Sequence, residues 1–181
     1  MKLEELMPRP DVAARYEAKV QASIERTREA MRSADFSQLP ITRALMGLRK
    51  LGWGRQKAEQ AASQEERLRA AGFISIPTRS ENEVLLGVAG RFWRPDSGTV
   101  RGLTAEEIVA FKRDGYAKAM WNFTVERAEE GVTRLATETR VVTYGSSARR
   151  KFRAYWLLVG AFSGLIRKEM LRLVKRNAER N

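Results

Sequence analysis

The chain has 181 residues with a formal net charge of +12, and it contains neither cysteine nor histidine. Without cysteine it forms no disulfide, no thiolate nucleophile and no Cys-built zinc site. Without histidine the common catalytic triads and imidazole–metal sites are excluded as well. We therefore expect one domain over residues 1–181 that holds no metal and no cofactor, and we expect binding rather than catalysis.

Hydrophobic residues make up 43% of the chain, which is enough for a core, but no run of them reaches the roughly 20 residues that span a membrane. The longest run, residues 155–166, is flanked by arginines. Residues 1–10 carry acidic side chains where a secretory signal would have its apolar segment. We therefore expect no targeting segment and a cytoplasmic location.

The first elements in the chain are predicted to be a strand and two short helices. Apolar and polar residues alternate along Val12–Val20, as in a strand with one buried face. Ser23 is a candidate N-cap for a helix over Ile24–Ser33. Pro40 suits the start of a second helix. The apolar face of that helix consists of Ile41, Ala44, Leu45 and Leu48.

The middle of the chain begins with a polar segment, residues 55–71, which predicts either a helical excursion or a mobile insertion. Strands are then expected at residues 73–76, 83–93 and 99–103. Thr104 and Glu107 form a capping box, which opens a short helix over residues 105–112.

Residues 117–144 carry the strongest hairpin signal. Both strands alternate in polarity, and Glu129-Glu130-Gly131 supplies the turn between them. Arg134, Glu138 and Arg140 share one face of the second strand. The opposite face of the hairpin presents Ala117, Ala119, Trp121, Phe123, Val125, Leu135, Thr137, Thr139 and Val141.

A long amphipathic helix is predicted after the hairpin, with Ser146 or Ser147 as its cap. Gly160 and Gly164 are candidates for a bend, because each glycine weakens a helix interior by about 1 kcal/mol. The apolar stripe, with a spacing of three or four residues, consists of Phe152, Tyr155, Trp156, Val159, Phe162, Ile166, Met170 and Leu173.

This order of elements predicts an α+β fold, because successive antiparallel strands with helices set apart do not build a parallel α/β fold. A single long helix with an apolar stripe has to be buried against the apolar face of the sheet. We expect a curved antiparallel sheet of about six to seven strands around the C-terminal helix, with two short helices after the first strand.

Four segments in this order resemble the START-like or SRPBCC superfamily, which includes polyketide cyclases, the birch-pollen allergen family and lipid-transfer domains. They are DVAARYEAKVQAS, ENEVLLGVAGRFW, the hairpin YAKAMWNFTVE…GVTRLATETRV and the terminal RRKFRAYWLLVGAFSGLIRKEMLRLVKRNAE. The resemblance implies the helix-grip fold, with a deep cavity that binds sterols, lipids, polyketides or aromatic hormones. It is a likeness of shape, so it carries over no catalytic residue, and the chain lacks the histidine that some of the cyclases use.

Strand parity and the helical stripe predict which side chains would line such a cavity. The inward hydroxyls of Thr137 and Thr139 favour a cavity over a filled core, because buried hydroxyls are costly unless they are hydrogen-bonded. They could also bond each other across the strands, and a packed core remains the alternative. The candidate ligand-binding residues are Tyr16, Trp121, Phe123, Thr137, Thr139, Tyr155, Trp156 and Val159.

We predict that the protein binds or transports a hydrophobic small molecule, such as a lipid, a polyketide or an aromatic compound. A cyclase- or dehydratase-type enzyme on the same fold is one alternative, and it needs an ionisable side chain inside the cavity. Glu138 and Arg140 would supply one only if they pointed inward, rather than forming an outward pair. No catalytic residue is predicted.

The second alternative is a protein that binds an anionic membrane or nucleic acid through its C-terminal helix. Residues 149–181 hold ten basic residues against two acidic ones. The other interpretation is a solvated helix face. The candidate contacts with an anionic surface are Arg149, Arg150, Arg167 and Arg172.

Overall fold

The computed structural model describes residues 2–36, 39, 64–94, 96 and 98–180. The predicted helix at residues 40–48 and the part of the predicted insertion at residues 55–63 lie outside the described residues, and the rest of that insertion forms a helix, α4. The elements are α1 (Leu3–Leu6), β1 (Val12–Val20), α2 (Ile24–Ser33), α4 (Gln64–Ala70), β2 (Ile74–Ile76), β3 (Glu83–Gly90), α5 (Ala105–Ala110), β4 (Ala117–Glu129), β5 (Val132–Thr143) and α6 (Ser146–Glu179).

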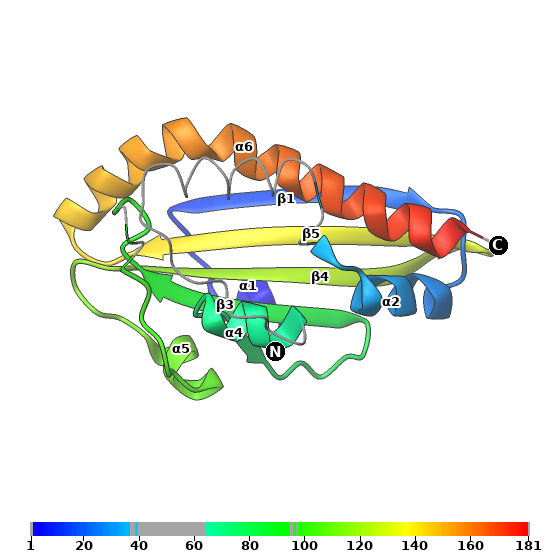
Figure 1. The fold of residues 1–181 in the computed structure, drawn as a ribbon, viewed down its shortest axis with the longest axis horizontal. Helices are drawn as coiled ribbons and strands as arrows, with labels where there is room; N and C mark the ends of the chain where they lie inside the picture. Colours follow the sequence, from blue (N-terminus) through cyan, green and yellow to red (C-terminus); the bar gives the residue numbers. More distant parts are fainter. Residues whose placement is uncertain (1, 37–38, 40–63, 95, 97, 181) are drawn as a thin grey trace.

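The predicted α+β organisation is confirmed, with one antiparallel sheet and a long C-terminal helix (Figure 1). β1 and α2 have the predicted bounds, and the Ser23 hydroxyl caps α2 by accepting a hydrogen bond from the Arg26 N–H. The capping box of Thr104 and Glu107 opens α5 as predicted.

The sheet has five strands in the order β1-β5-β4-β3-β2, so the expected six to seven strands are wrong for the part of the chain that the structure describes. Residues 99–103 form no strand. Gly98, directly before this segment, and Gly102, within it, both take positive φ angles, 46° and 76°, which are not the extended backbone of a strand. The Val100 N–H still donates a hydrogen bond to the Ala89 carbonyl, at 2.9 Å.

β4 and β5 form the predicted hairpin, and their register determines which side chains share a face. Trp121 pairs with Thr139 and Phe123 pairs with Thr137. Phe123 packs in a core cluster with Met170 of α6, so this is the face that the long helix covers. We refer to it below as the α6 face.

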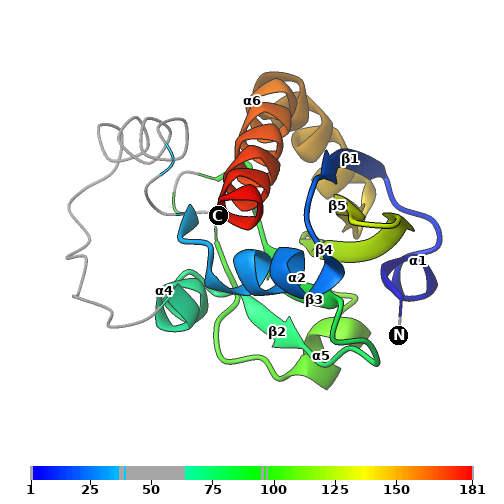
Figure 2. The same ribbon diagram turned by 90° about the vertical axis from the view of Figure 1, so that its right-hand side faces the viewer.

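α6 arches over β1 and β5, and its second half also packs against α2 (Figures 1 and 2). The predicted cap of this helix is wrong. Gly145, rather than Ser146 or Ser147, occupies the N-cap position without a side-chain hydrogen bond. Its φ of 89° suits glycine, and a Cβ at this position would collide with the carboxylate of Asp114.

The opposite face of the sheet, the α1 face, is covered by α1 and α5 (Figure 2). Leu3 and Met7 pack there with Ile108 of α5 and with Leu85 and Met120 of the sheet. Both faces are therefore buried, which explains why β3 is apolar on its two sides.

Candidate ligand-binding cavity

A cavity of about 780 Å³ lies between the sheet and α6, and residues of α2 and α4 also border it. Its volume is within the range of about 300–1,000 Å³ that is typical of small-molecule sites. The cavity lies on the α6 face, where the helix bridges the sheet without filling the space beneath it.

The wall that the sheet contributes comes from its three central strands and from Ser75 of β2. Successive side chains of a strand point to opposite faces, so every second residue reaches the cavity. This alternation presents mostly apolar groups to the interior. The residues that β3, β4 and β5 contribute are Val84, Leu86, Val88, Ala119, Trp121, Phe123, Thr139 and Val141.

The wall that α6 contributes follows the period of the helix, about 100° per residue. Phe162 was expected in this stripe, but it lies about 80° from Phe152 around the helix axis and is 49% exposed. Ser163, the next residue, lines the cavity instead of Phe162. The cavity-facing residues of α6 are Phe152, Tyr155, Trp156, Val159, Ser163, Ile166, Arg167 and Met170.

Six of the eight predicted site residues line the cavity, and two do not. Tyr16 and Thr137 are on the predicted strand faces, but they contact neighbouring protein groups instead. The six residues that the structure brings together are Trp121, Phe123, Thr139, Tyr155, Trp156 and Val159.

Thr137 positions the Trp121 ring. Its Oγ1 accepts a hydrogen bond from Trp121 Nε1 at 2.7 Å and lies 2.7 Å from the Asn122 carbonyl, to which it donates. The hydroxyl is thus satisfied as both donor and acceptor. This arrangement leaves the indole N–H engaged and turns the apolar ring of Trp121 to the cavity.

Tyr16 packs against α6 at Gly164. A Cβ at position 164 would lie 2.5 Å from the Tyr16 hydroxyl oxygen, so only glycine allows this approach. Gly160 has a similar role within the helix, since a Cβ there would lie 3.0 Å from Trp156 Nε1. The two glycines therefore permit close packing of aromatic side chains against the helix.

Arg167 is a cavity residue that the sequence analysis placed on the surface, and that placement is wrong. Its guanidinium carbon lies 4.5 Å from the centre of the Trp121 ring. Part of the residue is exposed, but Nη1 is buried and has no hydrogen-bond partner. Burial lowers the pKa of Arg167 to about 10, against a smaller opposing effect of Tyr16, so the side chain is still a cation at neutral pH.

The sequence did contain a signal for Arg167. The residue follows Ser163 by four positions and precedes Met170 by three, so it occupies the apolar stripe. A charged residue on an apolar helix face is a candidate functional group, because burial of an unpaired charge is costly.

Thr139 is the second unpaired polar group of the cavity. The residue is 7% exposed, and its Oγ1 has no hydrogen-bond partner. It stands opposite Trp121 in the β4–β5 register, next to the ring over which Arg167 lies. Of the four buried side-chain atoms without a partner among the described residues, two thus belong to this cavity.

Arg32, Asp35 and Arg69 contribute further polar groups where α2 and α4 border the cavity. Ionisable side chains therefore line the cavity, which a cyclase- or dehydratase-type enzyme would require. The enzyme alternative stays a prediction. Among the described residues, no group of three or more acidic side chains is placed to hold a metal ion.

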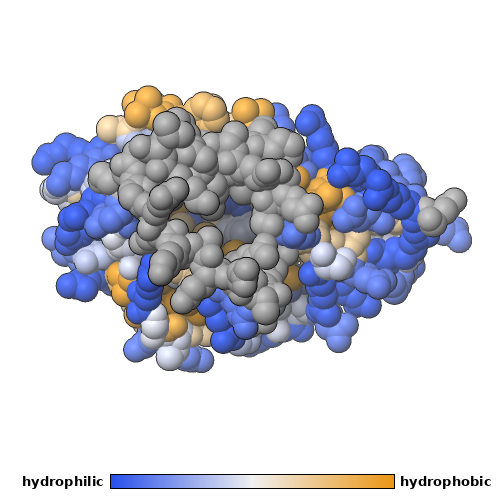
Figure 3. Space-filling view, viewed as in Figure 1, coloured by the Kyte–Doolittle hydropathy of each residue, from blue (hydrophilic) through white to orange (hydrophobic). Residues whose placement is uncertain are grey.

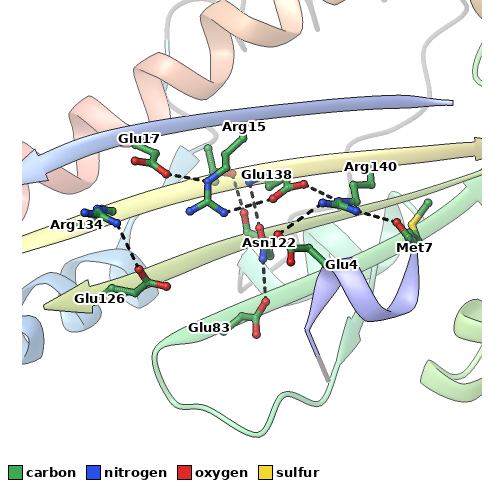
Figure 4. A network of polar contacts seen from close by, with 11 residues as sticks. Glu4, Met7, Arg15, Glu17, Glu83, Asn122, Glu126, Arg134, Glu138 and Arg140 are labelled. Atoms are coloured by element: carbon green, nitrogen blue, oxygen red, sulfur yellow. Dashed lines mark hydrogen bonds and ion pairs between the residues drawn. The ribbon is translucent and has the colours of Figure 1, made fainter. Parts of the chain in front are cut away.

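Glu138 and Arg140 lie on the α1 face and point away from the cavity (Figure 4). Arg140 Nε donates to Glu138 Oε1 at 2.6 Å, and its Nη1 donates to the Met7 carbonyl at 2.9 Å. The backbone N–H of Glu138 donates to Asn122 Oδ1 at 3.1 Å. The pair was expected on a solvated face, but α1 covers it and Glu138 is 5% exposed.

The predicted anionic-surface residues other than Arg167 are exposed on α6, and one of them has an ion-pair partner. Arg149 Nε lies 3.1 Å from Asp11 Oδ1. Arg150 and Arg172 are exposed. In the described part of the chain, no helix combines the length and apolar character that crossing a membrane requires.

Comparison with protein-family models, with curated proteins and with solved structures finds no match to this chain.

Proposed function

We propose that this protein binds or carries an apolar small molecule in the cavity beneath α6. The observation that supports this function is the volume of about 780 Å³ together with a lining that is mainly aliphatic and aromatic. Small-molecule sites are typically apolar hollows with a few well-placed polar groups. A lipid, a polyketide or an aromatic compound has the matching chemistry.

The architecture supports membership of the START-like superfamily as part of this proposal. A five-stranded antiparallel sheet, a helix directly after the first strand and a long C-terminal helix over one face agree with the helix-grip arrangement. A cytoplasmic location belongs to the same proposal.

The first test is whether the cavity takes up an apolar molecule. Organic extraction of the purified full chain followed by mass spectrometry should release a bound compound. The emptied protein should enhance the fluorescence of a neutral apolar probe, N-phenylnaphthylamine, with saturable binding. If nothing is extracted and the probe does not bind, the proposed function is wrong.

A cavity-filling variant tests whether the probe binds in this cavity. Ala119 lines the cavity and lies between Val88 and Val141 in the sheet, so Ala119→Trp places an indole in the hollow. Probe binding should fall by more than tenfold. The control is Ala154→Trp, at an exposed position of α6, which should leave probe binding unchanged.

A second candidate function is docking on an anionic membrane, which the outer side of α6 favours. Leu157 and Leu158 are 85% and 75% exposed, and Phe162 and Leu165 continue the same apolar ridge. Figure 3 shows apolar residues along the edge of the molecule that α6 forms. Basic residues precede and follow the ridge, including Arg150 and Lys168, which matches an interfacial amphipathic helix.

Co-sedimentation with vesicles tests this docking. The protein should bind phosphatidylcholine vesicles that contain phosphatidylserine, bind vesicles of phosphatidylcholine alone more weakly, and lose affinity as salt rises. The double substitution Leu157→Ser and Leu158→Ser should reduce binding to the anionic vesicles several-fold. Equal binding of both vesicle types by the wild-type chain would contradict an electrostatic contribution.

A further inference from the structure

The polar groups of the cavity point to the class of ligand that it takes. Arg167 presents a cationic guanidinium to a mainly apolar hollow, and its Nη1 lacks a hydrogen-bond partner. Among the described residues, no carboxylate pairs with it. A buried charge without a counter-charge is costly, so the ligand is the natural source of the missing anion.

Thr139 adds an independent observation. Its buried hydroxyl is unpaired, although Thr137, two residues earlier on the same strand face, makes two hydrogen bonds. Thr139 pairs with Trp121 in the sheet, and the guanidinium of Arg167 lies over the Trp121 ring at 4.5 Å. One cation and one hydroxyl donor therefore converge at the same wall of the cavity.

We infer that the cavity binds an amphipathic carboxylate, a molecule with an apolar body and a single carboxylate group, which Arg167 and Thr139 hold beside Trp121. This inference rests on the proposed function. A carboxylate matches the planar guanidinium and accepts hydrogen bonds from both donors. The apolar walls then enclose the rest of the molecule.

The charges around the cavity favour a single carboxylate over a more highly charged group. Arg32 also lines the cavity, but it is exposed and its Nη2 donates to the Glu81 carbonyl at 3.0 Å. Arg69 has other interactions as well. Among the described residues that line the cavity, Arg167 is thus the cation with a buried nitrogen that has no hydrogen-bond partner, and one negative charge neutralises it.

The test compares two ligands that differ in their headgroup alone, dodecanoate and dodecanol. Each displaces N-phenylnaphthylamine from the purified full chain at pH 7.5. We expect the wild-type chain to bind dodecanoate about 10- to 100-fold more tightly than dodecanol, which is the range for a hydrogen bond to a charged group. Arg167→Met should abolish this preference, and Thr139→Val should reduce it several-fold.

Arg172→Met is the matched control, because it removes an arginine from the exposed side of the same helix. It should leave the preference for dodecanoate unchanged. If the two ligands bind wild-type protein equally, or if the preference persists in Arg167→Met, the inference is overturned while binding of the neutral probe upholds the carrier function. If neither ligand nor the probe binds, the proposed function itself fails.

Discussion

The two faces of the sheet differ in how completely their buried polar side chains are hydrogen-bonded. On the α1 face the buried polar groups are paired: Glu138 is bound by Arg140 and Asn122 bonds Glu83 (Figure 4), and the buried Lys118 donates to the Val109 carbonyl. On the α6 face, Arg167 and Thr139 each bury an atom without a partner.

This difference separates a face that stabilises the fold from one that is suited to binding. An unpaired buried polar group lowers stability by about 1–3 kcal/mol, whereas a paired one costs little. The α1 face attaches the N-terminal segment to the sheet through its polar network. On the α6 face Thr137 is hydrogen-bonded, but Arg167 and Thr139 keep polar atoms open, and a ligand can supply the partners that the protein does not.

The largest expected effect is on the α1 face. Arg140→Met leaves Glu138 buried beside a weaker partner, Arg15, whose Nη1 lies 3.4 Å away, and removes the donor to the Met7 carbonyl. Breaking a buried pair in this way should lower the free energy of unfolding by about 3–5 kcal/mol, measured by denaturant titration. The control is Arg134→Met, since its pair with Glu126 is exposed and spans 4.0 Å, and it should change stability by less than about 1 kcal/mol.

On the α6 face, replacing an arginine by methionine should raise the free energy of unfolding instead of lowering it. Burial lowers the pKa of Arg167 to about 10, well below the ordinary value of an arginine, which corresponds to a cost of about 3 kcal/mol for burying the cation. The contact with Trp121 offsets part of this cost. Arg167→Met should therefore raise the free energy of unfolding of the ligand-free protein by about 1–3 kcal/mol. A clear loss of stability would show that the guanidinium has a strong partner in the folded protein.

The two threonines provide a smaller and closely matched comparison. Thr137→Val removes two hydrogen bonds and should lower the free energy of unfolding by about 1–3 kcal/mol. Thr139→Val removes a hydroxyl that has no partner, so it should be neutral or stabilising by about 1 kcal/mol. Thermal unfolding of both variants, in the absence of ligand, measures the difference. Equal losses of stability would contradict the distinction between a hydrogen-bonded and an unpaired hydroxyl on the α6 face.

The smallest expected effect is in the pH dependence. Below pH 10, Arg167 is protonated in both the folded and the unfolded chain, so the full cost of its burial is present. Above pH 10 the folded protein releases this proton before the unfolded chain does, and its stability rises relative to Arg167→Met. The stability difference between the two proteins should therefore shrink between pH 9 and pH 11, as measured by urea titration at each pH.

Several groups near Arg167 influence this profile. Tyr16 faces it from β1, Lys168 lies over the Tyr16 ring, and Arg32, Asp35 and Arg69 line the same cavity. These groups are present in both proteins, so the difference between wild type and variant isolates the contribution of Arg167. A constant difference over the whole range would contradict a lowered pKa at this residue.

Local patterns predicted the individual elements well. The alternation in Val12–Val20, the cap at Ser23 and the capping box at Thr104 all depend on residues close in sequence, and the structure confirms them. The number of strands was overestimated, because residues 99–103 have strand-like composition but form no strand, and Gly98 before them and Gly102 among them take positive φ angles.

Only part of the candidate site could be predicted, because local patterns give the face on which a residue lies but not its partners. Strand parity and helical period brought six of the eight candidate residues to the cavity wall. Strand parity and helical period could not show that the Thr137 hydroxyl would form hydrogen bonds with Trp121 and Asn122. Nor could they show that Tyr16 would pack on Gly164. Those contacts join elements that are far apart along the chain.

By itself, the sequence determined the α+β class, the hairpin, the long helix and the apolar sides of these elements, because each follows from local spacing and polarity. Only the tertiary structure decided that α6 leaves a hollow beneath it, that α1 buries the pair of Glu138 and Arg140, and that Arg167 points inward. The physical reason is that burial depends on which distant elements meet. The same arginine is a solvated surface charge or a cavity-lining cation with an unpaired nitrogen, according to the side of the helix that the sheet covers.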